Sequence, residues 1–242
     1  MLGASNVARG LPELVAAARA VAAGAHDLHV AGGHGRSYGL DTRVLGRGLP
    51  AILSCGVLEE LARLDPTRGP VRVAITDVGN DVAYGVEPAR ILSWIDECLA
   101  AAPTGATVSL GLPPAAPLGR LADRTLLLLR LVFFPSSRVP VPVLRARLAA
   151  LDRGLRELGE RVDVTLEPEP DWYGWDPIHV RRRHRETAWR LLLAAGDRAI
   201  RTRPRDQLAR LARPRRWSLF GVRLTGSQPA RRGPDGCRLW LW

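Results

Sequence analysis

The chain has 242 residues, of which 46% are hydrophobic, and it carries a formal net charge of +11. This length and apolar content exclude a disordered chain, because they suffice for the buried core of one large domain or of a domain with a short appendage. The positive charge comes from arginine alone, since the sequence contains no lysine.

The arginines gather in clusters at residues 181–183, 213–216 and 231–232. Such clusters can bind phosphates or anionic membrane surfaces. No recognisable nucleic-acid-binding motif accompanies them, and aromatic residues make up only 5% of the chain. We therefore interpret the clusters as solvated faces and expect no nucleic-acid partner.

The three cysteines, Cys55, Cys98 and Cys237, show neither close pairing nor the spacing of zinc ligands. The sequence thus predicts no disulfide framework and no metal site. The most apolar run, residues 125–134, is too short to span a bilayer and contains Arg130. With reduced thiols and no recognisable signal peptide, we expect a cytoplasmic location without a membrane span.

The first motif is Gly3-Ala4-Ser5, followed by apolar residues at helical spacing over residues 11–21. This pattern is typical of a tight strand-to-helix turn, which would place the Ser5 hydroxyl near a helix N-terminus. Ser5 is therefore a candidate nucleophile, and the alternative is a simple helix cap. A strand usually needs about five residues. Because only two precede this turn, we expect a truncated first strand and a natural start further upstream.

Residues 27–31 alternate like a strand and lead into a glycine-rich loop at residues 32–39 (GGHGRSYG). Glycine lets a backbone approach a ligand closely because it lacks a Cβ. Over about eight residues this loop resembles the phosphate-contacting loop of flavin-linked oxidases of the vanillyl-alcohol-oxidase type. The chain is too short for the surrounding flavin domain, so no cofactor is expected.

A buried strand is predicted at residues 49–54, an amphipathic helix at 57–64 and a further strand at 71–76. The last strand ends in residues 77–81 (DVGND). Open α/β sheets place functional groups at the carboxyl ends of their strands. Asn80 can therefore donate its side-chain N–H to an oxyanion, although asparagine is also an ordinary turn residue.

The alternation of helix and strand continues with a helix at residues 88–102 and a strand at 106–112. A proline-rich and apolar segment at residues 113–142 then interrupts it. We interpret this segment as an insertion that can cover a pocket, with plain packing as the alternative. A helix at residues 143–158 and a strand at 162–166 follow.

An acid and a histidine lie three positions apart in Asp176-Pro177-Ile178-His179. An aspartate within hydrogen-bond reach can orient an imidazole and stabilise its cation. Pro177 makes the link a rigid turn, because it fixes its own φ and moves Asp176 out of the α region. The alternative is that Asp176 only caps a helix that starts near His179, with the histidine in the first turn of that helix.

The composition shifts after residue 202. A short basic helix is predicted at residues 204–212, followed by two alternating segments at 217–224 and 237–242. A Gly/Pro/Ser-rich turn joins them, so a β-hairpin is expected.

The four motifs occur in the order of the four sequence blocks of the SGNH hydrolases, the GDSL-type esterases and lipases, and the chain resembles this family over residues 1–196. The motifs lie at residues 3–5, 32–39, 78–81 and 176–179.

By this resemblance Ser5 is similar to the nucleophile, His179 to the general base and Asp176 to the acid that orients it. Asn80 matches the side-chain oxyanion donor. The resemblance implies two further donors, the backbone N–H groups of Ser5 and of a glycine in the second block, for which Gly35 is preferred.

Two departures from the family pattern stand out. Ala4 replaces the aspartate usual before the serine. The second-block glycine also has three candidates in this sequence, Gly33, Gly35 and Gly39.

The resemblance implies an α/β fold, a three-layer α/β/α sandwich whose mainly parallel sheet has five strands, the first truncated. The expected domains are an SGNH-like domain at residues 1–202, with its insertion at 113–142, and a basic extension at 203–242. The expected function is ester hydrolysis through a Ser-His-Asp triad, on a small-molecule, lipid or carbohydrate ester. The alternative is a non-catalytic module that binds anionic ligands or polysaccharide through its arginines.

Overall fold

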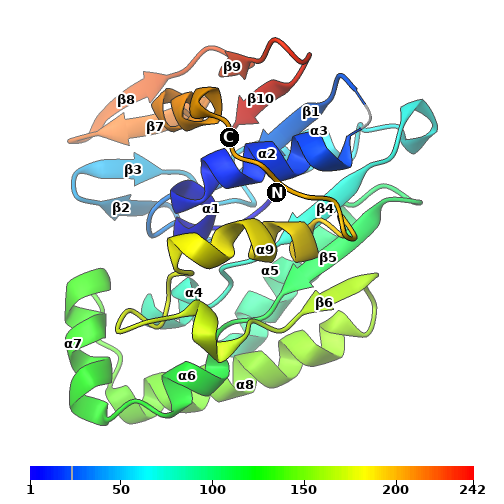
Figure 1. Ribbon diagram of the computed structural model, residues 1–242. Coiled ribbons are helices and arrows are strands. Elements are labelled where there is room, and N and C mark those ends of the chain that lie inside the picture. The colour runs from blue at the N-terminus through cyan, green and yellow to red at the C-terminus, as the bar shows by residue number, and fades with distance from the viewer. Residues whose placement is uncertain (23) are drawn as a thin grey trace.

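The computed structural model describes residues 1–22 and 24–242 and shows an α/β protein (Figure 1). Its strands form small sheets, and helices pack on both faces of the strands. None of the described helices is both long and apolar enough to cross a membrane.

Three parallel strands form one sheet, in the order β4 (Arg72–Ile75), β5 (Thr107–Gly111) and β6 (Val164–Leu166). All three were predicted from runs rich in β-branched and apolar residues. Because the strands are parallel, their carboxyl ends meet at one edge of the sheet. Thr76 and Leu112 lie at this edge, directly after β4 and β5.

A second sheet joins the two ends of the chain. In it β1 (Asp27–Val30) pairs in parallel with β10 (Arg238–Leu241), and β10 pairs antiparallel with β9 (Arg231–Arg232). The register aligns all four residues of β1 with β10. The last strand of the chain therefore covers one side of the first.

Leu2 lies between these two sheets. It forms parallel bridges to Ala31, just after β1, and to Ile75 in β4. Its N–H donates to Ala74 O at 2.8 Å and its carbonyl accepts from Thr76 N at 2.9 Å. The predicted first strand is thus reduced to one bridging residue. The predicted five-stranded parallel sheet is not present as such, because the strands fall into small parallel and mixed sheets.

An antiparallel sheet contains β2 (Thr42–Val44), β3 (Arg47–Leu49), β7 (Arg216–Leu219) and β8 (Val222–Thr225), in this order. A hairpin does form in the C-terminal part of the chain, but it differs from the predicted one. It lies within the first predicted segment, where β7 pairs with β8. The second segment forms β10 instead.

The strand predicted at residues 49–54 is wrong. Only Leu49 belongs to a strand, and the chain then turns. Ile52 in this turn is fully buried. A short buried apolar run looks the same in sequence whether the chain is extended or turned, so periodicity could not separate the two.

The predicted helices form, with ends shifted by a few residues, and the one predicted at 204–212 is a 3₁₀ helix. The helical segments are α1 (Ser5–Arg9), α2 (Leu11–Val21), α3 (Val57–Leu61), η1 (Pro66–Arg68), α4 (Asn80–Ala83), α5 (Pro88–Ala100), α6 (Ala115–Gly119), α7 (Asp123–Phe133), α8 (Val141–Gly159), η2 (Pro170–Trp172), α9 (Arg182–Leu192) and η3 (Pro204–Leu211).

Two apolar cores lie on opposite faces of the strands. Alternate residues of the last strand show this, since successive side chains of a strand point to opposite faces. Leu239 and Leu241 pack with residues of α2 and α9, whereas Trp240 and Trp242 pack with residues of α5 and α8. Figure 1 shows α2 and α9 on the near side of the strands.

Candidate active site

Ser5 opens α1 at the carboxyl edge of the strands, three residues after the Leu2 bridge. The turn that leads to it requires glycine at position 3. A Cβ on Gly3 would lie 2.7 Å from Val7 Cγ2 and 2.9 Å from Thr76 Cγ2, which is too close for any side chain. The residue types of the first motif therefore let the chain pass tightly from Leu2 into the helix.

Asp77, two residues after the end of β4, binds the backbone of the turn that leads to Ser5. Its Oδ2 atom accepts hydrogen bonds from the N–H groups of Ala4 and Asn6, both at 2.9 Å. Asp77 has a φ of +60°, a conformation that non-glycine residues rarely adopt. A carboxylate at the first turn of a helix satisfies its free N–H groups and interacts favourably with the helix dipole. Asp77 thereby fixes the residues on both sides of Ser5.

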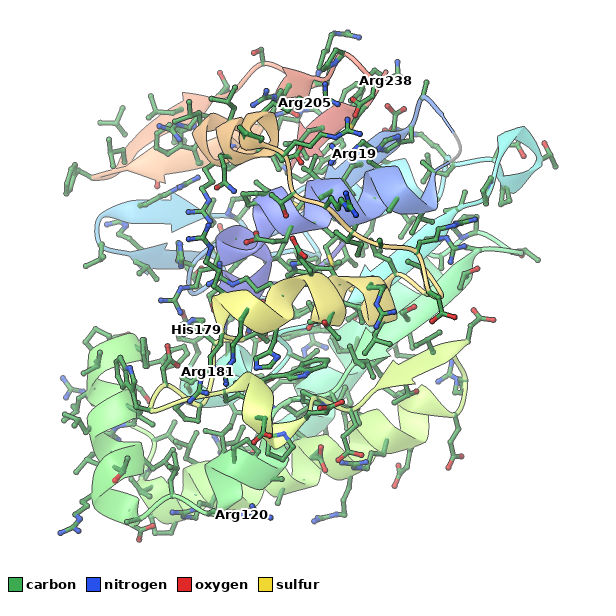
Figure 2. The ribbon with its side chains drawn as sticks, in the orientation of Figure 1. Arg19, Arg120, His179, Arg181, Arg205 and Arg238 are labelled. Atoms are coloured by element: carbon green, nitrogen blue, oxygen red, sulfur yellow. The ribbon has the colours of Figure 1, made fainter. Side chains whose placement is uncertain are left out.

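Ser5, His179 and Asp176 form a continuous chain of hydrogen bonds. The distance from Ser5 Oγ to His179 Nε2 is 2.9 Å, and that from His179 Nδ1 to Asp176 Oδ2 is 2.7 Å. His179 lies just before α9, near the N-terminal end of this helix (Figure 2). Its side chain is 10% exposed, and the ring of Phe133 packs against it edge-on with centroids 5.3 Å apart. This is the geometry of a nucleophile, a base and an orienting acid.

Asp176 is held as a carboxylate. It accepts hydrogen bonds from the N–H groups of Ile178 at 3.1 Å and His179 at 3.3 Å, and Arg9 Nη1 lies 3.3 Å from its Oδ2. Burial raises the pKa of Asp176, but the bonds from His179, Ile178 and Arg9 together hold this pKa below its ordinary value. The N-cap of α9 is Arg181, so Asp176 does not cap that helix.

Asn6 ties the serine helix to the histidine turn. Its Nδ2 donates to Ile178 O at 3.0 Å, and its Oδ1 accepts from Val180 N at 2.8 Å. These two backbone groups belong to the residues immediately before and after His179. Asn6 Nδ2 also donates to Asp77 Oδ1 at 2.7 Å. One side chain therefore sets where the imidazole lies relative to Ser5.

Asn80 opens α4, the short helix that follows β4. Asn80 is 7% exposed, and its Nδ2 donates a long hydrogen bond of 3.4 Å to Arg36 O. Asn80 and Ser5 line the same cavity. A side-chain amide there can donate a hydrogen bond to an oxyanion that forms beside Ser5.

Gly35 is not among the residues that line this cavity. It has a φ of +63°, which favours glycine, and its carbonyl accepts a hydrogen bond from Tyr84 Oη at 2.6 Å. A Cβ on Gly35 would meet Val44 at 2.4 Å. The Gly33 N–H donates to Ala4 O at 3.2 Å, next to Ser5. The structure thus places Gly35 against Tyr84 and Val44. The glycine that contacts the turn leading to Ser5 is Gly33.

Asp81 anchors the glycine-rich loop to α4. It accepts hydrogen bonds from the Ser37 hydroxyl and, at 3.2 Å, from Tyr38 N. Burial raises the pKa of Asp81 to about 6, and these two bonds only partly offset the effect. The loop after β1 and the turn after β4 are therefore held together by a carboxyl group with a high pKa.

An apolar cavity of about 110 Å³ opens beside Ser5 and Asn80. The segment predicted as an insertion contributes to it through α7, whose buried Leu126 and Leu129 line the cavity. Further apolar residues that line it are Leu112, Leu118, Phe134, Leu144, Leu148, Trp172 and Ile178. The cavity can therefore hold an apolar chain that reaches Ser5.

The sequence patterns did not reveal the roles of Asn6 and Asp77. Both lie inside motifs, one beside the serine and the other at the start of residues 77–81. Their partners are 71 and 172 positions away along the chain, so local spacing carries no signal of these contacts. Asparagine and aspartate at such turns also have an ordinary local explanation.

Within residues 1–22 and 24–242, no three or more His, Cys, Asp and Glu side chains gather in a way that could hold a metal ion. No protein family, no curated protein and no solved structure matches the chain.

Proposed function

We propose that this protein is a serine acyl hydrolase that cleaves an apolar acyl ester through Ser5, His179 and Asp176. The observation that carries the proposal is the unbroken hydrogen-bond chain from Ser5 Oγ through the His179 ring to Asp176, at 2.9 and 2.7 Å. Two of these residues are 174 positions apart. A local turn or a helix cap does not account for such a contact.

The first chemical step is the attack of Ser5 Oγ on the ester carbonyl. His179 Nε2 takes the hydroxyl proton, and Asp176 stabilises the imidazolium that forms. His179 then gives this proton to the departing alcohol, which leaves an acyl-serine. A water molecule, activated by the same imidazole, releases the acid and restores Ser5.

Negative charge develops on the carbonyl oxygen during both steps. The side-chain N–H of Asn80 and the backbone N–H of Ser5, in the first turn of α1, are the donors proposed to stabilise it. Removal of one oxyanion donor typically lowers turnover by about a hundredfold to a thousandfold. Asn80→Ala is expected to show a loss of this size.

The cavity next to Ser5 supports an apolar acyl group. Its wall is formed by leucine and aromatic side chains from α7, α8 and η2. Burial of each methylene group there contributes about 0.8 kcal/mol. Esters with acyl chains of several carbons are therefore the expected substrates, in preference to acetate esters.

We also propose that the chain is an SGNH-type hydrolase with a three-layer α/β/α architecture. The four motifs that carry the resemblance meet around Ser5. The parallel bridges of Leu2 to Ala31 and Ile75 support a single sheet that runs through this residue, with β10 and β1 on one side and β4, β5 and β6 on the other.

The proposal is tested with p-nitrophenyl butanoate and with a fluorophosphonate probe located by mass spectrometry. The wild-type protein should hydrolyse the ester and carry the probe on Ser5. Ser5→Ala should abolish both, whereas Ser93→Ala, which changes an exposed serine of α5, should change neither. A folded wild-type protein that shows neither hydrolysis nor labelling would contradict the proposal.

A further inference from the structure

A second pocket, of about 320 Å³, lies at the same edge of the strands as Ser5. Val30 and Gly32, at and after the end of β1, line it together with Leu241 of β10. The apolar cavity is instead lined by residues that follow β4, β5 and β6. Helix α1 lies between the two pockets, because Ser5 at its start lines the apolar cavity and Arg9 at its end lines the second pocket.

Arginines from four elements line this second pocket. They are Arg9 of α1, Arg47 of β3, Arg185 of α9 and Arg210 of η3. Arg185 Nη1 and Arg210 Nη2 both donate to the carbonyl of Arg9, at 2.9 and 3.4 Å. The charges of three separate parts of the chain thus converge on the end of the helix that carries Ser5.

Two of these arginines lack an acidic partner among the residues that the structure describes. Arg9 is bonded to Asp176, and Arg185 lies 4.0 Å from Glu13. Across the described part of the chain, neither Arg47 nor Arg210 forms an ion pair.

Arg47 is partly buried, and its Nε atom is buried without a hydrogen-bond partner. Its guanidinium group lies over the Trp217 ring at 5.3 Å. Burial and the neighbouring Arg213 both lower the pKa of Arg47. A partly buried cation without an ion-pair partner lowers stability, and an anion bound in the pocket would reduce that cost.

The positive field reaches the glycine-rich loop beside Ser5. His34, in the glycine-rich loop, has its pKa lowered by burial and also by the charges of Arg9, His179 and Arg47. A negatively charged group near Arg9 and Arg47 would interact favourably with both, and arginine suits phosphate because of its forked N–H donors.

We propose that the alcohol portion of the substrate ester carries a phosphate group, which binds to Arg47 and Arg210 while the acyl chain occupies the apolar cavity. This inference rests on the proposed function. In the reaction, the Ser5 Oγ–acyl bond forms and the acyl–alcohol C–O bond breaks, and His179 returns its proton to the phosphorylated alcohol. Water then converts the acyl-serine to the free acid.

The test compares 1-octanoylglycerol 3-phosphate with 1-octanoylglycerol, which has the same acyl chain and no charge. For the wild-type protein at low ionic strength, kcat/KM should be at least about tenfold higher for the phosphorylated ester, as expected for charge-assisted hydrogen bonds. The Arg47→Gln/Arg210→Gln variant should lose this preference and retain the rate on the neutral ester. Retention of that rate also shows that the variant is folded.

Arg120→Gln is the matched control, because it removes one exposed arginine after α6, at the other end of the view in Figure 2 from η3. It should keep the full preference. Equal kcat/KM for the two esters in the wild-type protein would overturn the inference and leave the proposed function standing. Hydrolysis of neither ester would overturn the proposed function and the inference with it.

A test with inorganic phosphate distinguishes a pocket that binds the phosphate group of a substrate from a pocket that binds a free anion. It should inhibit hydrolysis of the phosphorylated ester competitively in the wild-type protein, and it should not do so in the double variant. If inorganic phosphate binds to the wild-type protein in calorimetry while both esters are hydrolysed equally, the pocket serves a free anion and the inference is wrong.

Discussion

At the scale of single residues, the candidate site depends on side chains that hold other groups in place. Asn6 bonds to the backbone on both sides of His179, and Asp77 bonds to the backbone on both sides of Ser5. These contacts set the distance between the hydroxyl and the imidazole. A proton transfer needs that distance to be short, so a small displacement costs much of the rate.

Asn6→Leu keeps the approximate size of the side chain and removes its hydrogen bonds. The histidine turn would then be free to shift relative to Ser5. We expect kcat on p-nitrophenyl butanoate to fall about tenfold to a hundredfold while KM changes little, because the acyl cavity is formed mainly by other residues. Steady-state kinetics measure both values. A larger effect on KM than on kcat would contradict a positioning role for Asn6.

A second prediction concerns Asp81 and the dependence of the free energy of unfolding on pH. Its pKa is about 6 in the folded protein and 3.8 is the ordinary value. Between these pH values the folded state binds more protons than the unfolded state, so the free energy of unfolding falls as the pH rises. Asp81→Asn removes this titration. Relative to the wild type, the variant should therefore gain about 2 kcal/mol between pH 4 and pH 7.

Urea unfolding at the two pH values measures the difference. The comparison uses the change with pH, so any constant effect of the substitution on the Ser37 and Tyr38 bonds cancels. A stability difference between Asp81→Asn and wild type that is the same at pH 4 and pH 7 would show that this carboxyl keeps its ordinary pKa in the fold.

At the scale of elements, α7 decides the shape of the cavity. One face of this helix is buried through Leu126 and Leu129, whereas Leu128 on the other side is 60% exposed. A helix with apolar residues on both faces gives no sequence signal of which face points inward. The position of α7 over the site follows from its packing, and so does the contact of Phe133 with the His179 ring.

Leu129→Trp should fill part of the cavity. The rate on a butanoate ester should change little, whereas kcat/KM on an octanoate ester should fall about tenfold or more, because the longer chain loses buried methylene groups. The ratio of the two rates is the measurement. Leu128→Trp places the same side chain on the exposed face and should leave the ratio unchanged. If both variants shift the ratio equally, α7 does not select the acyl chain.

At the scale of the whole molecule, strands from the N-terminal and C-terminal parts of the chain pair with each other. Leu2 bridges the strands on either side of it, and β10 pairs with β1. Residues that follow the predicted boundary at residue 202 therefore support the strands that carry the site. Leu239 of β10 is 2% exposed and belongs to the core that contains residues of α2 and α9.

Leu239→Ala should lower the free energy of unfolding by about 2 to 5 kcal/mol, the usual cost of removing a buried leucine side chain. Leu211→Ala is the matched control, since Leu211 is 68% exposed, and it should change stability by less than about 0.5 kcal/mol. Urea unfolding measures both. A stable Leu239→Ala variant would mean that the C-terminal strand adds little to the fold.

The sequence by itself determined the residue types of the candidate triad, the order of the four motifs, and most helices, because these depend on local patterns of apolar residues, glycine and proline. It did not predict the turn at residues 49–54, the pairing of β10 with β1, or the roles of Asn6 and Asp77. Only the tertiary structure decided these features and the meeting of Ser5 with His179 across 174 positions of sequence. The physical reason is that contacts between distant segments depend on how the sheets and helices pack, and the spacing of residues along the chain carries no record of that packing.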